Sequence, residues 1–344
     1  MPKETMKAVI YAGPGKYEIV DKEIPQVKKA TDVLVKVLAA SVCGTDVHIL
    51  ADPPEYPATV GTTIGHELVG EVVDYGSEET GFQVGDRIIM DNNIESGVCE
   101  ACQSGNYNVC PNMKSLGMEI DGAFAQYCVC PETKMVKINK DVPVENAIFA
   151  EPLNCVMGGI KKLKVMPGDS VLILGGGPIG MYFAEILKRM GAGIVAVSEM
   201  SEFRIEYLKK GSTDVIINPA KDDLDQRVAE SLGGKADIVI DCVGILLNDA
   251  IRNVKPGGTI LLFGLNQSTK IEICQGDITR NGISVLGTFI GNDTLQTVAK
   301  GLNTNALNFE FMITHKLPLT EFGTALEAMR KGEALEVVLY PWEE

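Results

Sequence analysis

Apolar and polar residues alternate in short runs over the first 150 residues, a pattern typical of half-buried β-strands. Residues 32–37 (Asp-Val-Leu-Val-Lys-Val) alternate clearly, and residues 66–75, 84–90 and 124–129 are further strand candidates. Glycine or proline residues bound these runs. Several short strands at close spacing predict a small, mainly β, barrel-like domain.

The pattern changes near residue 150 to continuous apolar runs separated by amphipathic stretches. Residues 170–174 (Ser-Val-Leu-Ile-Leu) form an apolar run, as expected of a parallel strand buried on both faces. Five further strand candidates follow, and with the helices between them they predict a doubly wound sheet of six parallel strands. They are residues 194–197, 215–217, 237–240, 259–263 and 283–286.

After about residue 290 the alternation of strand and helix stops. Helices are predicted over 294–302 and 321–329, and a last strand over 336–340. We therefore expect an α/β fold with a mainly β domain over 1–152, completed by 291–344. A Rossmann domain is expected over 153–290.

Composition narrows the possible partners of the chain. Its 344 residues allow two domains with a core each. A balance of 31 basic against 46 acidic residues gives a net charge of −15, which provides no electrostatic footprint for nucleic acid or an anionic membrane. We identify no signal-type stretch and no apolar run near the ~20 residues of a membrane span. Nine cysteines, several in metal-type spacings, favour thiolate ligands in a reducing cytoplasm over disulfides.

Two short motifs contain the residue types that bind zinc. Cys43 begins the run Cys-Gly-Thr-Asp, and His66, one of three histidines, follows 23 residues later beside Glu67. Thiolate, imidazole and carboxylate groups are the ligands that zinc uses in proteins. Either Cys43 or His66 alone would be interpreted as an ordinary core residue. Combined with a nucleotide-binding motif later in the chain, the pair predicts a metal site.

Polar residues just after Cys43 suit such a metal site. Asp46 is placed to orient a ligating histidine. The Thr45 hydroxyl and the His48 imidazole offer a route for the proton that a substrate alcohol loses. The alternatives are a helix or turn cap for Thr45 and Asp46, and an exposed polar residue for His48. Residues 44–86 contain no lysine or arginine, which favours a neutral alcohol or polyol over a phosphorylated or carboxylate substrate.

A second cluster has the spacing C-x2-C-x7-C of a structural zinc lobe; its members are Cys99, Cys102 and Cys110. A closed zinc site needs four ligands, but Ser96 stands where a fourth cysteine would complete the run. Either a carboxylate such as Glu95 substitutes, or the lobe holds no metal. Cys128 and Cys130 are expected to point to opposite faces of a strand and to serve in packing.

The strand over 170–174 leads directly into the motif G-x-G-x-x-G, and an amphipathic stretch over 181–190 follows, which is the context that this motif requires. Such a motif places a pyrophosphate at a helix N-terminus; its residues are Gly175, Gly177, Pro178, Ile179 and Gly180. Glu199 is placed to hydrogen-bond the adenosine ribose and to repel a 2′-phosphate, which favours NAD over NADP. Arg204 is expected near the adenine or in a salt bridge on a helix surface.

The carboxyl ends of the later strands carry four residues against which a nicotinamide could rest. Core packing is an equally good interpretation of each: Cys242, Val243, Leu265 and Phe289.

These motifs resemble those of the zinc-dependent medium-chain alcohol dehydrogenases, particularly the sorbitol dehydrogenase and L-threonine dehydrogenase branch. The resemblance covers essentially the whole chain and includes Asp121-Gly-Ala-Phe-Ala and the run 313–319. It implies a GroES-like first domain completed by the C-terminal tail. It also implies a homotetramer or a dimer.

The resemblance assigns the catalytic zinc to Cys43, His66 and Glu67, with Glu151 as a ligand or close neighbour. Cys155, four residues beyond Glu151, is a competing candidate. The chain departs from the family pattern in two places: at Ser96, and at Glu336, where a basic residue is common.

The reaction implied by the resemblance is reversible hydride transfer from a secondary alcohol or polyol to NAD. L-threonine and a sugar phosphate of the galactitol-phosphate type are alternative substrates. A catalytically silent NAD-binding sensor or structural protein is an alternative of another class. That alternative predicts a missing metal ligand or relay residue, whereas all of them are present.

Overall fold

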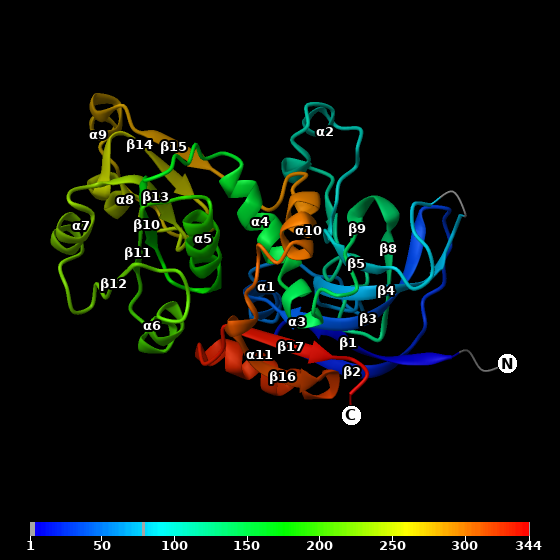
Figure 1. The fold of residues 1–344 in the computed structure, drawn as a ribbon. Coiled ribbons are helices and arrows are strands. Elements are labelled where there is room, and N and C mark those ends of the chain that lie inside the picture. The colour runs from blue at the N-terminus through cyan, green and yellow to red at the C-terminus, as the bar shows by residue number, and fades with distance from the viewer. Residues whose placement is uncertain (1–3, 78–79, 344) are drawn as a thin grey trace. The chain divides into compact units, whose positions relative to one another are not determined.

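The computed structural model describes residues 4–77 and 80–343 (Figure 1). It divides into two compact units: one contains the chain up to Asn154 and again from Gly291, and the other contains Cys155–Ile290. Within the described residues, no helix has the length and apolar character needed to cross a membrane.

The first unit is built on a sheet with the strand order β16-β17-β3-β4-β5-β9, in which β8 also pairs with β3. Its strands are β3 (Asp32–Val42), β4 (Glu67–Tyr75), β5 (Arg87–Met90), β8 (Tyr127–Pro131), β9 (Met135–Lys137), β16 (Ile313–Pro318) and β17 (Glu336–Tyr340). All pairs are antiparallel except β16 with β17. Because Val337 on β17 lies opposite Val42 on β3, the C-terminal strand joins this sheet directly.

Short elements surround that sheet. Two small antiparallel sheets of two strands pair β1 (Thr5–Gly13) with β2 (Lys16–Glu23) and β6 (Asn93–Ile94) with β7 (Lys114–Ser115). The helices are α1 (Gly44–Ile49), α2 (Glu100–Gln103), α3 (Val144–Ala147), α10 (Leu295–Asn303) and α11 (Phe322–Lys331), with 3-10 turns η1 (Tyr107–Val109), η2 (Glu132–Lys134), η3 (Glu310–Met312) and η4 (Leu319–Glu321). In the core of this unit, Phe124 packs against Phe322 of α11, and their ring centroids lie 5.2 Å apart. Helix α4 (Ala150–Ile160) spans the boundary between the units.

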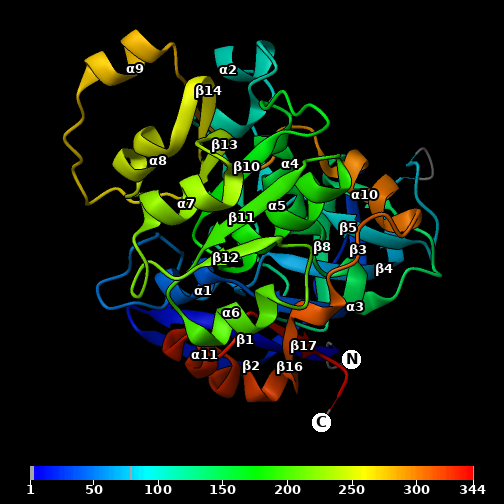
Figure 2. The same cartoon turned by 60° about the vertical axis from the view of Figure 1, so that its left-hand side comes forward.

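The second unit is a sheet of six parallel strands in the order β12-β11-β10-β13-β14-β15, which confirms the predicted doubly wound fold (Figures 1 and 2). The strands are β10 (Ser170–Leu174), β11 (Ile194–Ser198), β12 (Val215–Ile217), β13 (Ala236–Asp241), β14 (Val254–Leu262) and β15 (Ser284–Gly287). The helices are α5 (Pro178–Arg189), α6 (Glu202–Leu208), α7 (Leu224–Leu232), α8 (Leu247–Asn253) and α9 (Gln275–Asn281). Every residue of β10 is buried, as its apolar run predicts.

A carboxylate ties three strands of this sheet together near their amino ends. Asp237 on β13 accepts hydrogen bonds from the Ser170 amide (2.8 Å) and hydroxyl (2.7 Å) and from Lys255 Nζ on β14 (2.8 Å). Burial alone would raise the pKa of Asp237, but the bonds from Lys255 and Ser170 outweigh it, and the pKa lies below its ordinary value.

Some predicted strand limits differ from the structure. β5 begins at Arg87 rather than at residue 84, because Gly85 has a φ of +88° and leaves Val84 exposed in a turn. The prediction that Cys128 and Cys130 point to opposite faces is wrong, because their sulfur atoms lie 3.8 Å apart on the same face of β8. Their predicted role in packing is confirmed, since both are buried in the core of the first unit. Residues two positions apart on a strand share a face, so the alternation predicts proximity instead.

Candidate active site

The structure brings Cys43, His66 and Glu67 together at the ends of two paired strands. Cys43 follows β3 and is the residue just before α1, while His66 and Glu67 stand at the start of β4. Among the described residues, one ligand atom from each of the three lies within 4.8 Å of the others. His66 and Glu67 are buried and Cys43 is half-buried. We call these three residues the metal cluster.

Gly65 determines how the chain enters this cluster. Its φ of +88° lies in the left-handed region, and a Cβ built on it would lie 2.4 Å from the Phe124 ring. A side chain is therefore excluded both by the backbone conformation and by the packing. The glycine in the sequence Gly-His-Glu consequently allows Phe124 to pack directly against the backbone before His66.

Asp46 connects two members of the metal cluster. Its Oδ2 accepts a hydrogen bond from the Cys43 amide (2.9 Å), and its Oδ1 lies 3.4 Å from His66 Nδ1. Asp46 is fully buried, as its position on the inner side of α1 requires. Because Nδ1 faces this carboxylate, Nε2 is the ring nitrogen left for a metal ion.

The electrostatics of the metal cluster favour a cation. Burial, and then the charge of Glu67, raise the pKa of the Cys43 thiol to about 12. Burial, and then the charge of Glu336, raise the pKa of Glu67 to about 8. Burial lowers the pKa of His66, but Asp46 and Cys43 outweigh it, so that this pKa lies well above its ordinary value. Sulfur, imidazole and carboxylate donors held so closely, with no lysine or arginine among them, fit a zinc ion.

The other residues predicted for this site occupy different places. Thr45 Oγ1 lies 3.7 Å from Cys43 Sγ, beside the metal cluster. His48, on the same helix, is half-exposed, and its Nδ1 lies 2.9 Å from Glu55 Oε2. Glu151 is buried in the first turn of α4, but neither it nor Cys155 belongs to the set of donors within 4.8 Å in the described part of the chain.

Sequence reasoning missed two polar partners of these side chains. The Ser41 hydroxyl donates a hydrogen bond to Glu67 Oε2 across the pair β3–β4. Glu55, in the loop after α1, provides the carboxylate beside His48. No local motif marks either residue, although Ser41 is a polar residue at the inner end of an alternating strand.

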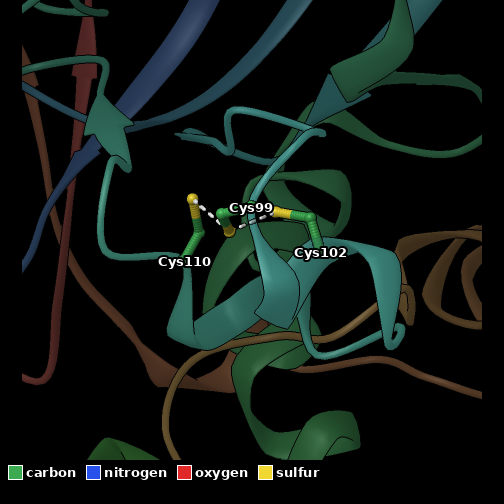
Figure 3. Close-up of side chains that lie close together, drawn as sticks. All are labelled: Cys99, Cys102 and Cys110. Atoms are coloured by element: carbon green, nitrogen blue, oxygen red, sulfur yellow. Dashed lines mark hydrogen bonds between the residues drawn. The ribbon is translucent and has the colours of Figure 1, made fainter.

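The second cysteine cluster is also assembled, as Figure 3 shows for its three side chains. Cys99 Sγ lies 3.4 Å from Cys102 Sγ and 3.7 Å from Cys110 Sγ. Ser96 lies beside Cys110, with its Oγ 3.5 Å from Cys110 Sγ, and hydrogen bonding with its hydroxyl and amide lowers the pKa of Cys110 to about 6. Glu95, the alternative fourth ligand, instead pairs with Lys134.

In the second unit, the glycine motif forms the turn between β10 and α5. Gly175 has a φ of +101°, and a Cβ on Gly180 would lie 2.0 Å from the Gly175 carbonyl oxygen, so helix and strand pack closely only with glycine at both positions. Gly177 precedes the first turn of α5, with Pro178 and Ile179 as its first residues. This is the geometry in which amide groups at a helix N-terminus receive a pyrophosphate.

Glu199 lies at the end of β11 and is firmly held. Its Oε2 accepts a hydrogen bond from the Gly176 amide (3.0 Å), and its Oε1 accepts bonds from the amides of Met200 and Ser201 (2.8 Å each). Arg204 on α6 approaches it, with Nη1 3.6 Å from Oε2. The carboxylate is thus fixed beside the glycine turn.

The residues predicted to meet a nicotinamide follow the carboxyl ends of the strands. Asp241 holds the loop after β13 by accepting hydrogen bonds from the amides of Val243 (2.8 Å), Gly244 (2.8 Å) and Leu246 (2.9 Å). Cys242 is half-buried, whereas Val243, Leu265 and Phe289 are exposed. Because Val243, Leu265 and Phe289 are exposed, core packing does not explain these three apolar residues.

A parallel sheet with a glycine turn and a separate β unit with a metal cluster define a dinucleotide-dependent, metal-binding dehydrogenase. Comparisons with known proteins agree. The model of the alcohol dehydrogenase GroES-like domain matches residues 29–140, and the zinc-binding dehydrogenase model matches residues 178–304.

Individual relatives extend this match over nearly the whole chain. L-threonine 3-dehydrogenase of Caldanaerobacter subterraneus subsp. tengcongensis is 37% identical, covering 94% of this chain and 95% of that protein. Sorbitol dehydrogenase of Halalkalibacterium halodurans is 31% identical, covering 98% of this chain and 99% of that protein. A solved zinc-binding dehydrogenase from Sinorhizobium meliloti 1021, bound to NADP, superposes with a TM-score of 0.93 at 32% identity, covering 98% of this chain and 100% of that one.

The chain belongs to the zinc-dependent medium-chain alcohol dehydrogenase family. It is an oxidoreductase that acts on CH–OH donors with a nicotinamide dinucleotide.

Proposed function

We propose that this enzyme oxidises a secondary alcohol or polyol, reversibly, with NAD as the hydride acceptor and a catalytic zinc ion in the metal cluster. The observation that carries the proposal is the convergence of Cys43, His66 and Glu67 donors within 4.8 Å. Asp46 supports it, because a buried carboxylate behind the imidazole orients the histidine and strengthens it as a ligand.

Each residue of the metal cluster has a distinct role in this proposal. Cys43 Sγ and His66 Nε2 would hold the ion, and Glu67 would be a third ligand, with the Ser41 hydroxyl orienting its carboxylate. Glu151 is a further candidate ligand from the start of α4. Zinc in this place supplies a Lewis acid that lowers the pKa of a neighbouring hydroxyl, and NAD supplies the hydride acceptor.

The proton of the alcohol is proposed to leave along α1. The Thr45 hydroxyl stands beside the metal cluster and can accept this proton while it donates its own. His48 is 46% exposed and has Glu55 at Nδ1, so its imidazole can pass a proton to solvent. Thr45 and His48 are three positions apart on α1, which is less than one helical turn, so the two side chains are suited to the two ends of one proton route.

Glu199 supports NAD over NADP. Three backbone amides hold its carboxylate beside the glycine turn, where an adenosine ribose hydroxyl would donate a hydrogen bond to it and a 2′-phosphate would meet its negative charge. Arg204 is close enough to attract a phosphate, but its guanidinium faces Glu199. The balance of these two side chains therefore favours NAD.

The substrate is proposed to be neutral, since residues 44–86, which include most of the metal cluster, contain no lysine or arginine. That absence disfavours a sugar phosphate, which needs a cationic partner. L-threonine is the second candidate, because its β-carbon carries a secondary hydroxyl and a threonine dehydrogenase is 37% identical to this chain. An oligomer, a tetramer or a dimer, and a cytoplasmic location remain predictions.

For the lobe, we propose three thiolate ligands with the Ser96 hydroxyl at the fourth position. Ser96 Oγ is close to Cys110, whereas Glu95 is occupied by Lys134. Serine is a weak zinc ligand, so the ion should be held loosely. Ser96→Cys should convert the lobe to a tight site, which elemental analysis after dialysis against a chelator would detect.

An NAD-coupled screen of polyols, secondary alcohols and L-threonine on zinc-loaded enzyme tests the proposal. His66→Ala should abolish turnover and zinc retention at the metal cluster, while the matched control His315→Ala, on β16, should retain both. Turnover by a His66→Ala enzyme would contradict the proposed role of the metal cluster. A preference for NADP over NAD would contradict the proposed cofactor.

A further inference from the structure

Glu336 is a buried acidic residue at the start of β17, and its side chain belongs to the surroundings of the metal cluster. It is only 5% exposed. The register of the sheet places Val338 of β17 opposite Ser41 of β3, and Ser41 opposite Glu67 of β4. Three adjacent strands thus lead from β17 to the metal cluster (Figure 1).

The register also determines which face Glu336 occupies. Directly opposite residues of antiparallel strands point to the same face, and residues two apart on one strand share a face. Ser41 and Glu67 share a face, as their hydrogen bond shows, and Val338 shares it with Ser41. Glu336, two residues before Val338, therefore lies on this same face. Because Val337 is opposite Val42, Glu336 is level with Cys43.

Electrostatics agree with this placement. After burial, the charge of Glu336 is the largest influence that raises the pKa of Glu67. Two carboxylates that share a buried face repel each other, and a divalent cation between their charges relieves this repulsion. A basic residue at position 336 would act in the opposite way, because it would pair with Glu67 and compete with the metal.

We propose that Glu336 is a positioning residue for the zinc site: its carboxylate, acting through Glu67, raises the affinity of the metal cluster for a divalent cation. Glu336 is not one of the donors within 4.8 Å, so it acts by charge and by keeping Glu67 free of a cationic side chain. The inference rests on the proposed metal role of Cys43, His66 and Glu67.

The test is zinc affinity measured by competition with a chromophoric chelator on the full chain. Glu336→Gln removes the charge at nearly constant shape and should weaken binding about 10-fold or more, the range found when groups behind metal ligands are removed. Glu336→Lys should weaken it further, and Glu336→Asp should stay close to the natural chain. Glu71→Gln, four residues beyond Glu67 on β4, removes an equal charge about 13 Å away along the strand and should change the affinity less than twofold.

Two controls make each outcome decisive. His66→Ala identifies which binding step belongs to the metal cluster, and fluorescence of Trp342 shows whether each variant is folded. Should Glu336→Gln not fold, Glu336→Asp against Glu336→Asn gives the same charge comparison at a shorter length. Equal zinc affinities for charged and neutral variants, or tighter binding by Glu336→Lys, would overturn the inference. Failure of the natural chain to bind zinc at His66 would instead contradict the proposed function.

Discussion

Replacing Gly65 by alanine tests how the chain positions His66. Gly65 and Gly61 have the same φ of +88°, but their surroundings differ. A Cβ on Gly65 would lie 2.4 Å from Phe124, whereas nothing lies within 4 Å of a Cβ on Gly61. The two substitutions therefore share the backbone cost and differ in the steric clash.

The magnitudes follow from these two terms. A left-handed conformation costs a residue with a Cβ about 1–2 kcal/mol, which is the effect expected of Gly61→Ala. Forcing an atom into a packed core adds typically about 1–3 kcal/mol. Gly65→Ala should therefore destabilise the first unit by about 2–5 kcal/mol, and Phe124→Leu should recover part of that loss. Since His66 is the next residue, zinc retention should fall as well.

Urea unfolding followed by the fluorescence of Trp342 measures this effect in the first unit. Trp342 is the only tryptophan, and its Nε1 donates a hydrogen bond to the Val37 carbonyl (2.8 Å) on β3. The zinc concentration must be held constant, because a bound ion stabilises the folded state by mass action. Equal losses of stability for Gly65→Ala and Gly61→Ala, or no gain from Phe124→Leu, would refute the reasoning.

Three further predictions concern other parts of the chain. Asp46→Asn should weaken zinc binding about 10–100-fold in chelator competition, because the negative charge facing His66 is lost; an unchanged affinity would exclude this role. Glu199→Ala should raise the ratio of kcat/KM for NADP to that for NAD about tenfold or more, because the repulsion of a 2′-phosphate disappears. A tenfold change corresponds to about 1.4 kcal/mol, the free energy of a shift by one pKa unit. A constant ratio would show that other groups select the cofactor. Asp237→Asn should destabilise the second unit by about 1–2 kcal/mol, as measured by hydrogen exchange of its backbone amides. Because the folded pKa of Asp237 is lowered, its contribution is complete above the ordinary pKa and is lost as the pH falls through the folded value. A mutant with the natural acid sensitivity would contradict this assignment.

The parallel sheet was predictable because its signals are local. β10 and β12 begin and end where their apolar runs do, at 170–174 and 215–217. Burial on both faces leaves little room for polar residues in such strands. Strand limits in the first unit were less predictable. There a single turn at Gly85 moved the start of β5, and the periodicity around Cys128 and Cys130 was misinterpreted.

The donors of the metal cluster were predictable because residue types and spacing identify them. Their partners were not, since these depend on strand register. Ser41 reaches Glu67 from the paired strand, 26 residues away in the chain, and Glu336 reaches the same face from the C-terminal strand. Glu95 shows that closeness in sequence does not make a ligand: it is near the lobe in sequence, but its carboxylate forms an ion pair with Lys134. Pairings of that kind follow from tertiary packing alone.

Reconstitution with zinc tests the central claim most directly. The enzyme is stripped with a chelator, zinc is added back stepwise, and both the zinc content and the rate of NAD reduction with a secondary alcohol are measured. The stripped enzyme should lose its activity. The activity should return in proportion to the zinc bound at the metal cluster, which is the zinc that the His66→Ala variant does not bind. A stripped enzyme that retains its full rate would contradict the central claim.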